Sequence, residues 1–169
     1  MNYLIHSNEC NYYEYVLTSD ISKYDMGKKT FFDILTKMAL ENHKCFEKKY
    51  KEYIVSNNIT CHNYENKDIK IYTNKALYIE NKDKYIIIGY NKTKQTILNY
   101  PSTNNIYVTN YIKKLIFRVT NRIYINFEIC LQENKKKLYK IYINYNHDNN
   151  VDTKIINQNI DDLLKIITK

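Results

Sequence analysis

The histidines and cysteines are the side chains most suited to chemistry, because imidazole and thiol groups serve both metal binding and nucleophilic catalysis. His43 and Cys45 are separated by one residue, and Cys61 directly precedes His62. Structural zinc sites space paired ligands more widely, and adjacent residues rarely reach one ion without strain. Widely spread cysteines in a chain without a secretory signal are typical of reduced core residues. We therefore expect no metal site and no cofactor.

Motifs of phosphate-binding loops and of serine hydrolases are missing from the sequence. The only glycines are Gly27 and Gly89, so no glycine-rich loop can cradle a phosphate. None of the histidines lies in a known catalytic motif. These observations favour a non-enzymatic protein without catalytic residues.

Tyrosine and lysine alternate along part of the chain, in the manner of a surface for single-stranded nucleic acid. Basic groups can follow a phosphate backbone while aromatic rings stack on bases. The candidate nucleic-acid-binding residues are Tyr85, Tyr90, Lys92, Lys94, Tyr100, Tyr107, Arg118 and Arg122. A codon bias toward A and T, which favours Tyr, Lys, Asn and Ile, explains the same enrichment without any function.

Lysine clusters are candidate sites for an anionic headgroup or a phosphate. The formal net charge is +8, and among the 26 Lys and Arg residues only Arg118 and Arg122 are arginine. Bidentate phosphate recognition favours arginine, so its scarcity weakens the case for a polyanionic partner. The candidate anion-binding residues are Lys75, Lys82, Lys84, Lys135, Lys136 and Lys137.

The chain has 169 residues, a length that predicts a single domain. Its helices and strands must position the candidate residues. Residues 1–28 form an N-terminal extension, with a short strand predicted from Tyr12 to Leu17. Apolar residues at three- and four-residue steps predict a long amphipathic helix over 30–54. Antiparallel strands follow over 66–145, and a second helix is predicted over 156–168.

The last strands are the clearest elements. Ile123, Ile125, Phe127, Ile129 and Leu131 alternate with polar residues, and residues 137–145 alternate in the same way across a polar turn. With residues 114–119 they form a three-stranded antiparallel meander with one core face and one mostly wet face. The predicted class is α+β, an antiparallel sheet or partly closed barrel with both helices packed on it.

Strands closed by a C-terminal helix resemble the pleckstrin-homology-like layout in element order. Lys75, Lys82 and Lys84 lie between the early strands, where the resemblance implies basic ligands for a headgroup. The chain has no tryptophan for the terminal helix, and a long helix precedes the strands, so we assign no family.

The predicted function is a non-enzymatic interaction module, a small subunit of a larger assembly that binds a protein partner through its long helix and its sheet surface. Two alternatives stay open: single-stranded nucleic-acid binding through the tyrosine and lysine face, and binding of anionic lipid or phosphate by a domain of the pleckstrin-homology-like kind. No stretch is apolar enough to span a membrane, and membrane-surface binding is not favoured. The expected location is intracellular, cytoplasmic or nuclear, without secretion.

Overall fold

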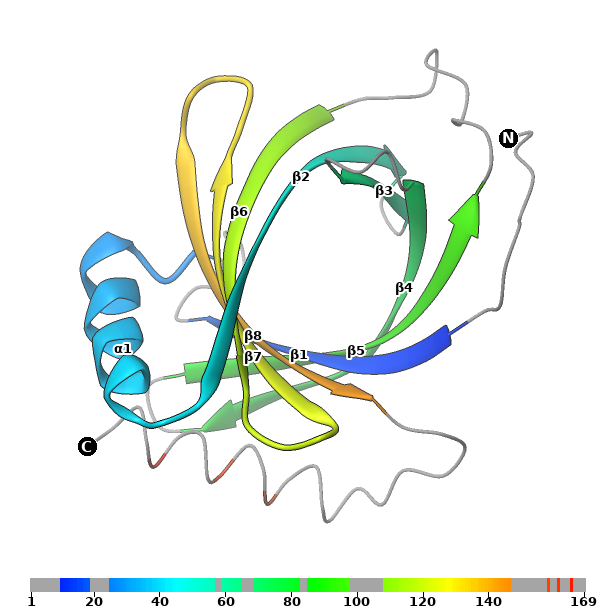
Figure 1. The fold of residues 1–169 in the computed structure, drawn as a ribbon. Coiled ribbons are helices and arrows are strands. Elements are labelled where there is room, and N and C mark those ends of the chain that lie inside the picture. Colours follow the sequence, from blue (N-terminus) through cyan, green and yellow to red (C-terminus); the bar gives the residue numbers. More distant parts are fainter. Residues whose placement is uncertain are drawn as a thin grey trace.

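A computed structural model of the chain describes residues 10–18, 25–56, 59–64, 69–82, 85–97 and 108–146, with Gln158, Asp161 and Lys165. Eight antiparallel strands close into a barrel in the order β1-β5-β4-β3-β2-β6-β7-β8 (Figure 1). For most of β4 and β5 the description is limited to backbone pairing. The elements are β1 (Cys10–Thr18), α1 (Lys28–Leu40), β2 (Lys44–Ser56), β3 (Ile59–Tyr64), β4 (Ile69–Lys82), β5 (Tyr85–Ile97), β6 (Val108–Arg118), β7 (Ile123–Leu131) and β8 (Lys137–Asn146).

The barrel closes through β1, which pairs with β5 along one edge and with β8 along the other. On the β8 side the register runs from Tyr12 opposite Asn146 to Leu17 opposite Ile141. The predicted antiparallel sheet and its meander of β6, β7 and β8 are confirmed. The sheet is a closed barrel rather than a partly closed one.

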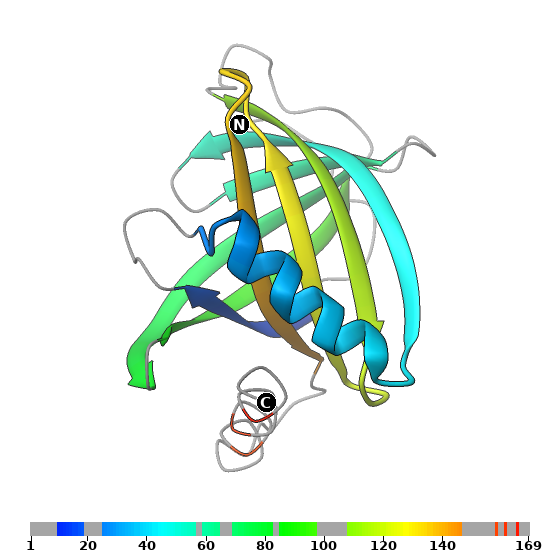
Figure 2. The same cartoon turned by 90° about the vertical axis from the view of Figure 1, so that its left-hand side faces the viewer.

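Helix α1 lies on the outside of the barrel against β6, β7 and β8 (Figure 2). Its buried residues recur at three- and four-residue steps and enter the main apolar cluster, where the Phe31 ring meets the Phe127 ring edge-on at 5.7 Å. The strands contribute odd-numbered residues to this cluster, because alternate residues of a strand face the same side. These include Tyr15, Leu17, Phe117, Ile123, Ile125, Phe127, Ile141 and Ile143.

Two hydrogen bonds attach the chain before α1 to the backbone of β8. The Tyr139 N–H donates to Asp25 Oδ1 at 3.0 Å, and the Met26 N–H donates to the Tyr139 carbonyl at 2.8 Å. Gly27 then adopts φ of 77°, in the left-handed region that favours glycine, and its carbonyl accepts the first helical bond from Phe31. This anchor fixes where α1 begins on the sheet.

The long helix predicted over 30–54 is wrong. Helix α1 ends at Leu40, where Glu41 turns to extended backbone, and residues 44–56 form β2. The apolar residues of this segment fit both periods, because Phe46, Tyr50 and Ile54 also share one face of a strand. Pairing with β3 and β6 provides hydrogen-bond partners for the backbone N–H and C=O groups of this segment, and it therefore favours the strand over the helix.

The C-terminal helix predicted over 156–168 is not supported as an element of the fold. Nearly all of that range lies outside the described residues, of which only Gln158, Asp161 and Lys165 belong to it. Within the described part of the chain, no helix is both long enough and apolar enough to cross a membrane.

The packing of α1 predicts different costs for two adjacent phenylalanines. Phe31 is 1% exposed and Phe32 is 39% exposed. Phe31→Ala should lower the free energy of unfolding by about 3–5 kcal/mol, because it leaves a cavity between α1 and β7. Phe32→Ala is the matched control and should cost less than about half as much. Urea unfolding followed by circular dichroism measures both, and equal losses would contradict this account of the core.

Candidate active site inside the barrel

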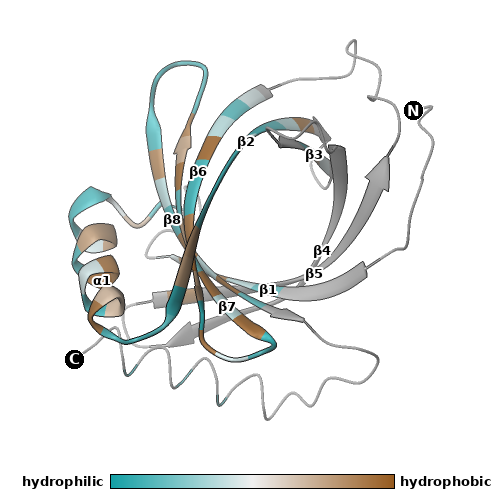
Figure 3. Ribbon diagram, in the orientation of Figure 1, coloured by the Kyte–Doolittle hydropathy of each residue, from teal (hydrophilic) through white to brown (hydrophobic). Residues whose placement is uncertain are grey.

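The second face of the sheet is not wet but encloses the barrel interior. Hydrophobic and hydrophilic residues alternate along β7 from Ile123 to Ile129 (Figure 3). Since odd-numbered residues face α1, the even-numbered ones lie on the interior face. The buried polar residues all have even numbers: Glu14, Thr18, His62, Asn110, Asn126 and Glu128. An eight-stranded barrel has an interior just wide enough for side chains or for one small ligand.

Three lysines and one glutamate form a row across four neighbouring strands. In register, Lys48 lies opposite Lys114, Lys114 opposite Glu128, and Glu128 opposite Lys140. We call Lys48, Lys114 and Lys140 the basic row. Like charges directly opposite each other destabilise a sheet, so the pairing of Lys48 with Lys114 has a cost to stability. An anionic ligand would relieve it.

Hydrogen bonds and aromatic rings hold this row in place. Lys114 Nζ donates to the Tyr142 hydroxyl at 3.2 Å, and that hydroxyl donates to Glu128 Oε1 at 3.0 Å. The Lys114 ammonium also lies 5.0 Å from the ring centroid of Tyr50 and 5.7 Å from that of Tyr142. Aromatic faces attract a cation without neutralising it, so these contacts hold the Lys114 ammonium group on the interior face.

Carboxylates around the interior keep Lys140 charged. Burial alone would lower the pKa of Lys140, but the charges of Glu128, Glu52 and Glu14 outweigh it and raise the pKa. Lys140 is therefore a cation at neutral pH although it is half-buried. The interior offers fixed positive charge rather than a neutral amine that could act as a base.

Glu52 forms a second polar group with residues of β3 and β6. His62 Nε2 lies 3.0 Å from Glu52 Oε2, and Asn110 Nδ2 donates to Glu52 Oε1 at 3.2 Å. The Tyr50 and His62 rings are stacked at 4.4 Å. Burial opposes ionisation, but the bond to His62, the charges of His62 and Lys140, and the bond from Asn110 lower the pKa of Glu52 to about 2. This carboxylate is ionised across the physiological range.

Cys45, Cys61 and Cys130 are poor nucleophiles. Burial raises the pKa of Cys61 to about 11 and that of Cys130 to about 12, and it also raises the pKa of the exposed Cys45. A neutral thiol attacks weakly, so these residues do not favour a covalent phosphocysteine step. Among the described residues, no three His, Cys, Asp or Glu side chains converge to hold a metal ion.

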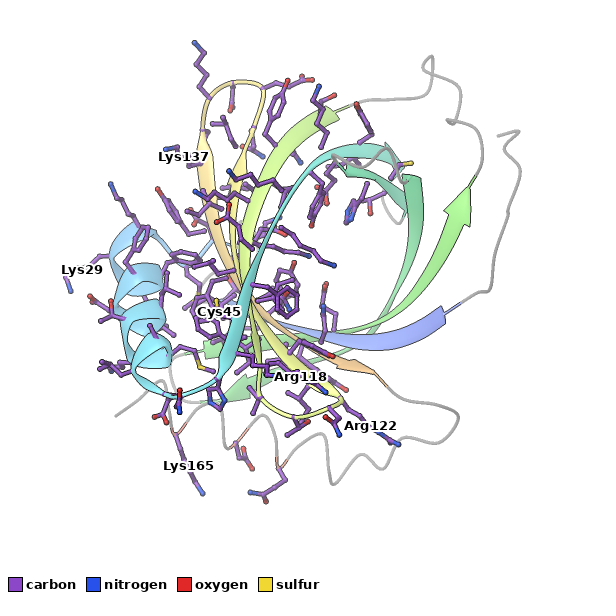
Figure 4. All side chains as sticks on the ribbon, in the orientation of Figure 1. Lys29, Cys45, Arg118, Arg122, Lys137 and Lys165 are labelled. Carbon is purple, nitrogen blue, oxygen red and sulfur yellow. The ribbon has the colours of Figure 1, made fainter. Side chains whose placement is uncertain are left out.

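The residues predicted for nucleic-acid binding fall into three groups. Arg118 and Arg122 lie together where β6 turns into β7 (Figure 4). Tyr85, Tyr90, Lys92 and Lys94 belong to β5, where the register places Tyr90 opposite Glu14 and Lys92 opposite Tyr12. Tyr100 and Tyr107 lie outside the described residues.

The residues predicted to bind anions do not form one described site. Lys135 and Lys136 lie in the β7–β8 turn and Lys137 begins β8, all three exposed and at the barrel end opposite Arg118 (Figure 4). Lys75 and Lys82 lie on β4, and Lys84 is outside the described residues.

Sequence reasoning missed the interior group. The signal was present in the even-numbered positions of β7 and β8, where Asn126, Glu128, Lys140 and Tyr142 alternate with core residues. Such positions indicate a wet face in an open sheet and an enclosed polar face in a closed barrel.

Solved structures with the same fold include RNA triphosphatases. The mimivirus capping enzyme triphosphatase matches with a TM-score of 0.69 at 8% identity, over 94% of this chain and 90% of that one. The S. pombe Pct1 RNA triphosphatase matches with a TM-score of 0.62 at 9% identity, over 82% of this chain and 71% of that one. A structure of Pct1 in complex with the Spt5 CTD matches with a TM-score of 0.61 at 10% identity, over 82% and 72% of the two chains. No protein-family model and no curated protein sequence matches the chain.

These likenesses overturn the predicted function. The expectation of a non-enzymatic interaction module is wrong, because the barrels that share this fold belong to enzymes. The two alternatives, a non-enzymatic nucleic-acid-binding surface and a pleckstrin-homology-like lipid domain, are overturned for the same reason. The long contact helix on which the predicted module depended is also absent, since residues 44–56 are β2.

The low pKa of Glu52 predicts how pH changes stability. A carboxyl whose pKa falls from 4.5 to about 2 on folding stabilises the protein above pH 4.5, and this contribution is lost as the pH falls toward 2. Wild type should therefore be more stable than Glu52→Gln near neutral pH, and the difference should shrink through that window. Urea unfolding at several pH values measures it.

Glu47→Gln is the control on the same strand, because Glu47 is exposed and pairs only with the exposed Lys49 in the described contacts. Its effect on stability should be small throughout. A Glu52→Gln deficit that stays constant from neutral pH to about pH 3 would contradict the assigned pKa.

Proposed function

We propose that this chain removes the terminal phosphate from the 5′ triphosphate end of RNA, with the triphosphate bound along the basic row. The observation that carries the proposal is the row itself, in which Lys114 and Lys140 flank Glu128 on the interior face of the barrel and the exposed Lys48 lies opposite Lys114. Support for the substrate comes from the fold, which RNA triphosphatases of S. pombe and mimivirus share.

The reaction is hydrolysis of a phosphoanhydride. A water oxygen forms a bond to the terminal phosphorus, and the bond from that phosphorus to the bridging oxygen breaks. The products are inorganic phosphate and an RNA with a 5′ diphosphate, and the proton released by the water passes to a carboxylate and then to solvent. Negative charge spreads over the phosphoryl oxygens in the transition state, so positioning and positive charge supply most of the catalysis.

The interior residues fit these requirements. Lys114 and Lys140 are held as cations beside Glu128, where they can bind and stabilise the phosphoryl oxygens. Glu128 lies between them in register and accepts a bond from Tyr142, so it is placed to orient the attacking water and take its proton. Proteins bind Mg²⁺ through one or two carboxylates together with substrate phosphates. Glu14 and Glu128 would contact an ion carried with the triphosphate, and the ion would neutralise phosphate charge.

An RNA substrate would make nucleic acid a partner of this chain. The complex of S. pombe Pct1 with the Spt5 CTD supports a protein partner as well, in line with the sequence-based prediction. The intracellular location stays a prediction.

The proposal predicts unequal effects of two adjacent lysines on β6. Lys114 faces the interior, and Lys113 is exposed on the outer face. Lys114→Gln should lower kcat about 10²–10³-fold, because it removes a cation from the transition state. Lys113→Gln should leave kcat unchanged. Release of inorganic phosphate from tripolyphosphate and from 5′-triphosphate RNA, both with Mg²⁺, measures the effect.

Circular dichroism and urea unfolding of both variants separate lost activity from lost folding. Equal losses of kcat in folded Lys113→Gln and Lys114→Gln would exclude the basic row as the phosphate site. A wild-type protein that releases phosphate from neither substrate would refute the proposed function.

A further inference from the structure

Both arginines of the chain lie at one end of the barrel. Arg118 ends β6, Arg122 precedes β7, and Lys44 at the start of β2 lies opposite Arg118 in register (Figure 4). We call Lys44, Arg118 and Arg122 the arginine mouth. Lys44 and Arg122 are exposed, and Arg118 is half-exposed. The mouth thus concentrates the only guanidinium groups beside the interior.

The arginine mouth has a defined geometry. Arg118 Nη2 donates a hydrogen bond to Asn121 Oδ1 within the turn. Thr120 Oγ1 accepts bonds at 3.2 Å from the backbone N–H groups of Arg122 and Ile123, which fix the turn. Guanidinium groups are suited to phosphate, and here two of them are presented on an ordered turn.

The mouth and the basic row are one above the other on the same face of β6. Lys114 and Arg118 are four residues apart, which is about 13 Å along an extended strand. The level between them holds Phe46 and Ile116, paired in register, and Asn126 opposite Ile116. Phe46 is 41% exposed, although it lies on the interior face. An aromatic ring accessible at this level can stack on a base.

Two amide oxygens require a donor. One belongs to Asn126 at this level, and the other belongs to Asn144 at the adjoining level, since Asn144 lies opposite Tyr124 and Tyr124 opposite Arg118. Asn126 is 1% exposed. The Oδ1 atoms of Asn126 and Asn144 are buried and have no hydrogen-bond partner among the described residues. We call these two oxygens the acceptor pair. An ionised polyphosphate offers only acceptors, whereas ribose hydroxyls and base N–H groups are donors. The acceptor pair therefore suits a nucleoside and not a further phosphate.

We propose that RNA enters the barrel through the arginine mouth, with its first nucleoside at Phe46 and the acceptor pair and its next phosphodiester at the mouth. This inference rests on the proposed function, because it takes the basic row as the site of the triphosphate. It makes the protein specific for a triphosphate that carries an RNA chain over free tripolyphosphate. The opposite end of the barrel, with Lys135 and Lys136, takes no part.

The test compares two substrates in the double variant Arg118→Gln/Arg122→Gln. The kcat/KM for a 5′-triphosphate RNA of about ten nucleotides should fall about tenfold more than that for tripolyphosphate. The salt dependence of RNA binding, measured by fluorescence anisotropy, should flatten by about 0.7 in its logarithmic slope, because the mouth neutralises one phosphodiester of a single strand. Lys135→Gln is the control and should change neither quantity.

The outcomes separate the two proposals. Equal losses on both substrates, or an unchanged RNA slope, would overturn the entry route and leave the hydrolase intact. Failure of the wild type to hydrolyse either substrate would refute the proposed function. In that case, comparison of RNA binding by wild type and by the arginine double variant would still test the arginine mouth. A Lys135→Gln variant that loses RNA affinity as strongly as the arginine variant would place the entry at the other end.

A second variant tests the nucleoside level. Asn126→Leu replaces a buried amide by an apolar group of similar size. The change removes an unsatisfied Oδ1 together with one long hydrogen bond, from Asn126 Nδ2 to the Tyr142 carbonyl at 3.5 Å, so the net cost to the free protein should be small. It should weaken ATP binding at least fivefold, leave tripolyphosphate binding unchanged within twofold, and not lower the urea midpoint. A fall in stability with equal losses for ATP and tripolyphosphate would mean that Asn126 serves the fold alone.

Discussion

Pairing of β1 with β8 turns an open sheet into an enclosed space, and the chemistry of this protein depends on that closure. Without it, the even-numbered residues of β6, β7 and β8 would face water. With it, Glu128 becomes 6% exposed and Asn126 1% exposed. Polar groups in such a place must be bonded to each other or to a ligand, since an unpartnered buried group is costly. Closure therefore creates both the site and the constraint that its charges balance.

The interior meets this constraint by mutual support. Three glutamates keep Lys140 protonated, and His62, Lys140 and Asn110 keep Glu52 ionised. Removal of one member would leave another charge buried without compensation, which is the costly case for buried ion pairs. Lys48 and Lys114 lie opposite each other across neighbouring strands, which is a like-charge pair with a cost to stability. This pair fits the proposed site for a polyanion, because a bound anion would relieve the repulsion.

The pattern of apolar residues predicted those elements in which it fits the strand period of two residues and does not fit the helical period of 3.6. Strand β7 was predicted with its bounds because five apolar residues alternate without exception, and the meander followed from its turns. Residues 44–54 fit both a helix and a strand, and only pairing with β3 and β6 resolves them. Arg118 and Arg122 were singled out and do lie together. The interior site was beyond reach, since Glu14, Glu52 and Lys140 meet only when the barrel closes.

The first half of β2 shows what else the lysine content does. Register pairs between β2 and β3 begin at Tyr50, so in the described structure residues 44–49 pair with β6 alone. A strand with one open edge is a template on which another chain can add, and this one carries the exposed Cys45 and Phe46. Lysines at 44, 48 and 49 flank these residues and make such addition electrostatically unfavourable. The lysines thereby keep this edge of β2, which has one paired side among the described residues, from acting as a seed for aggregation.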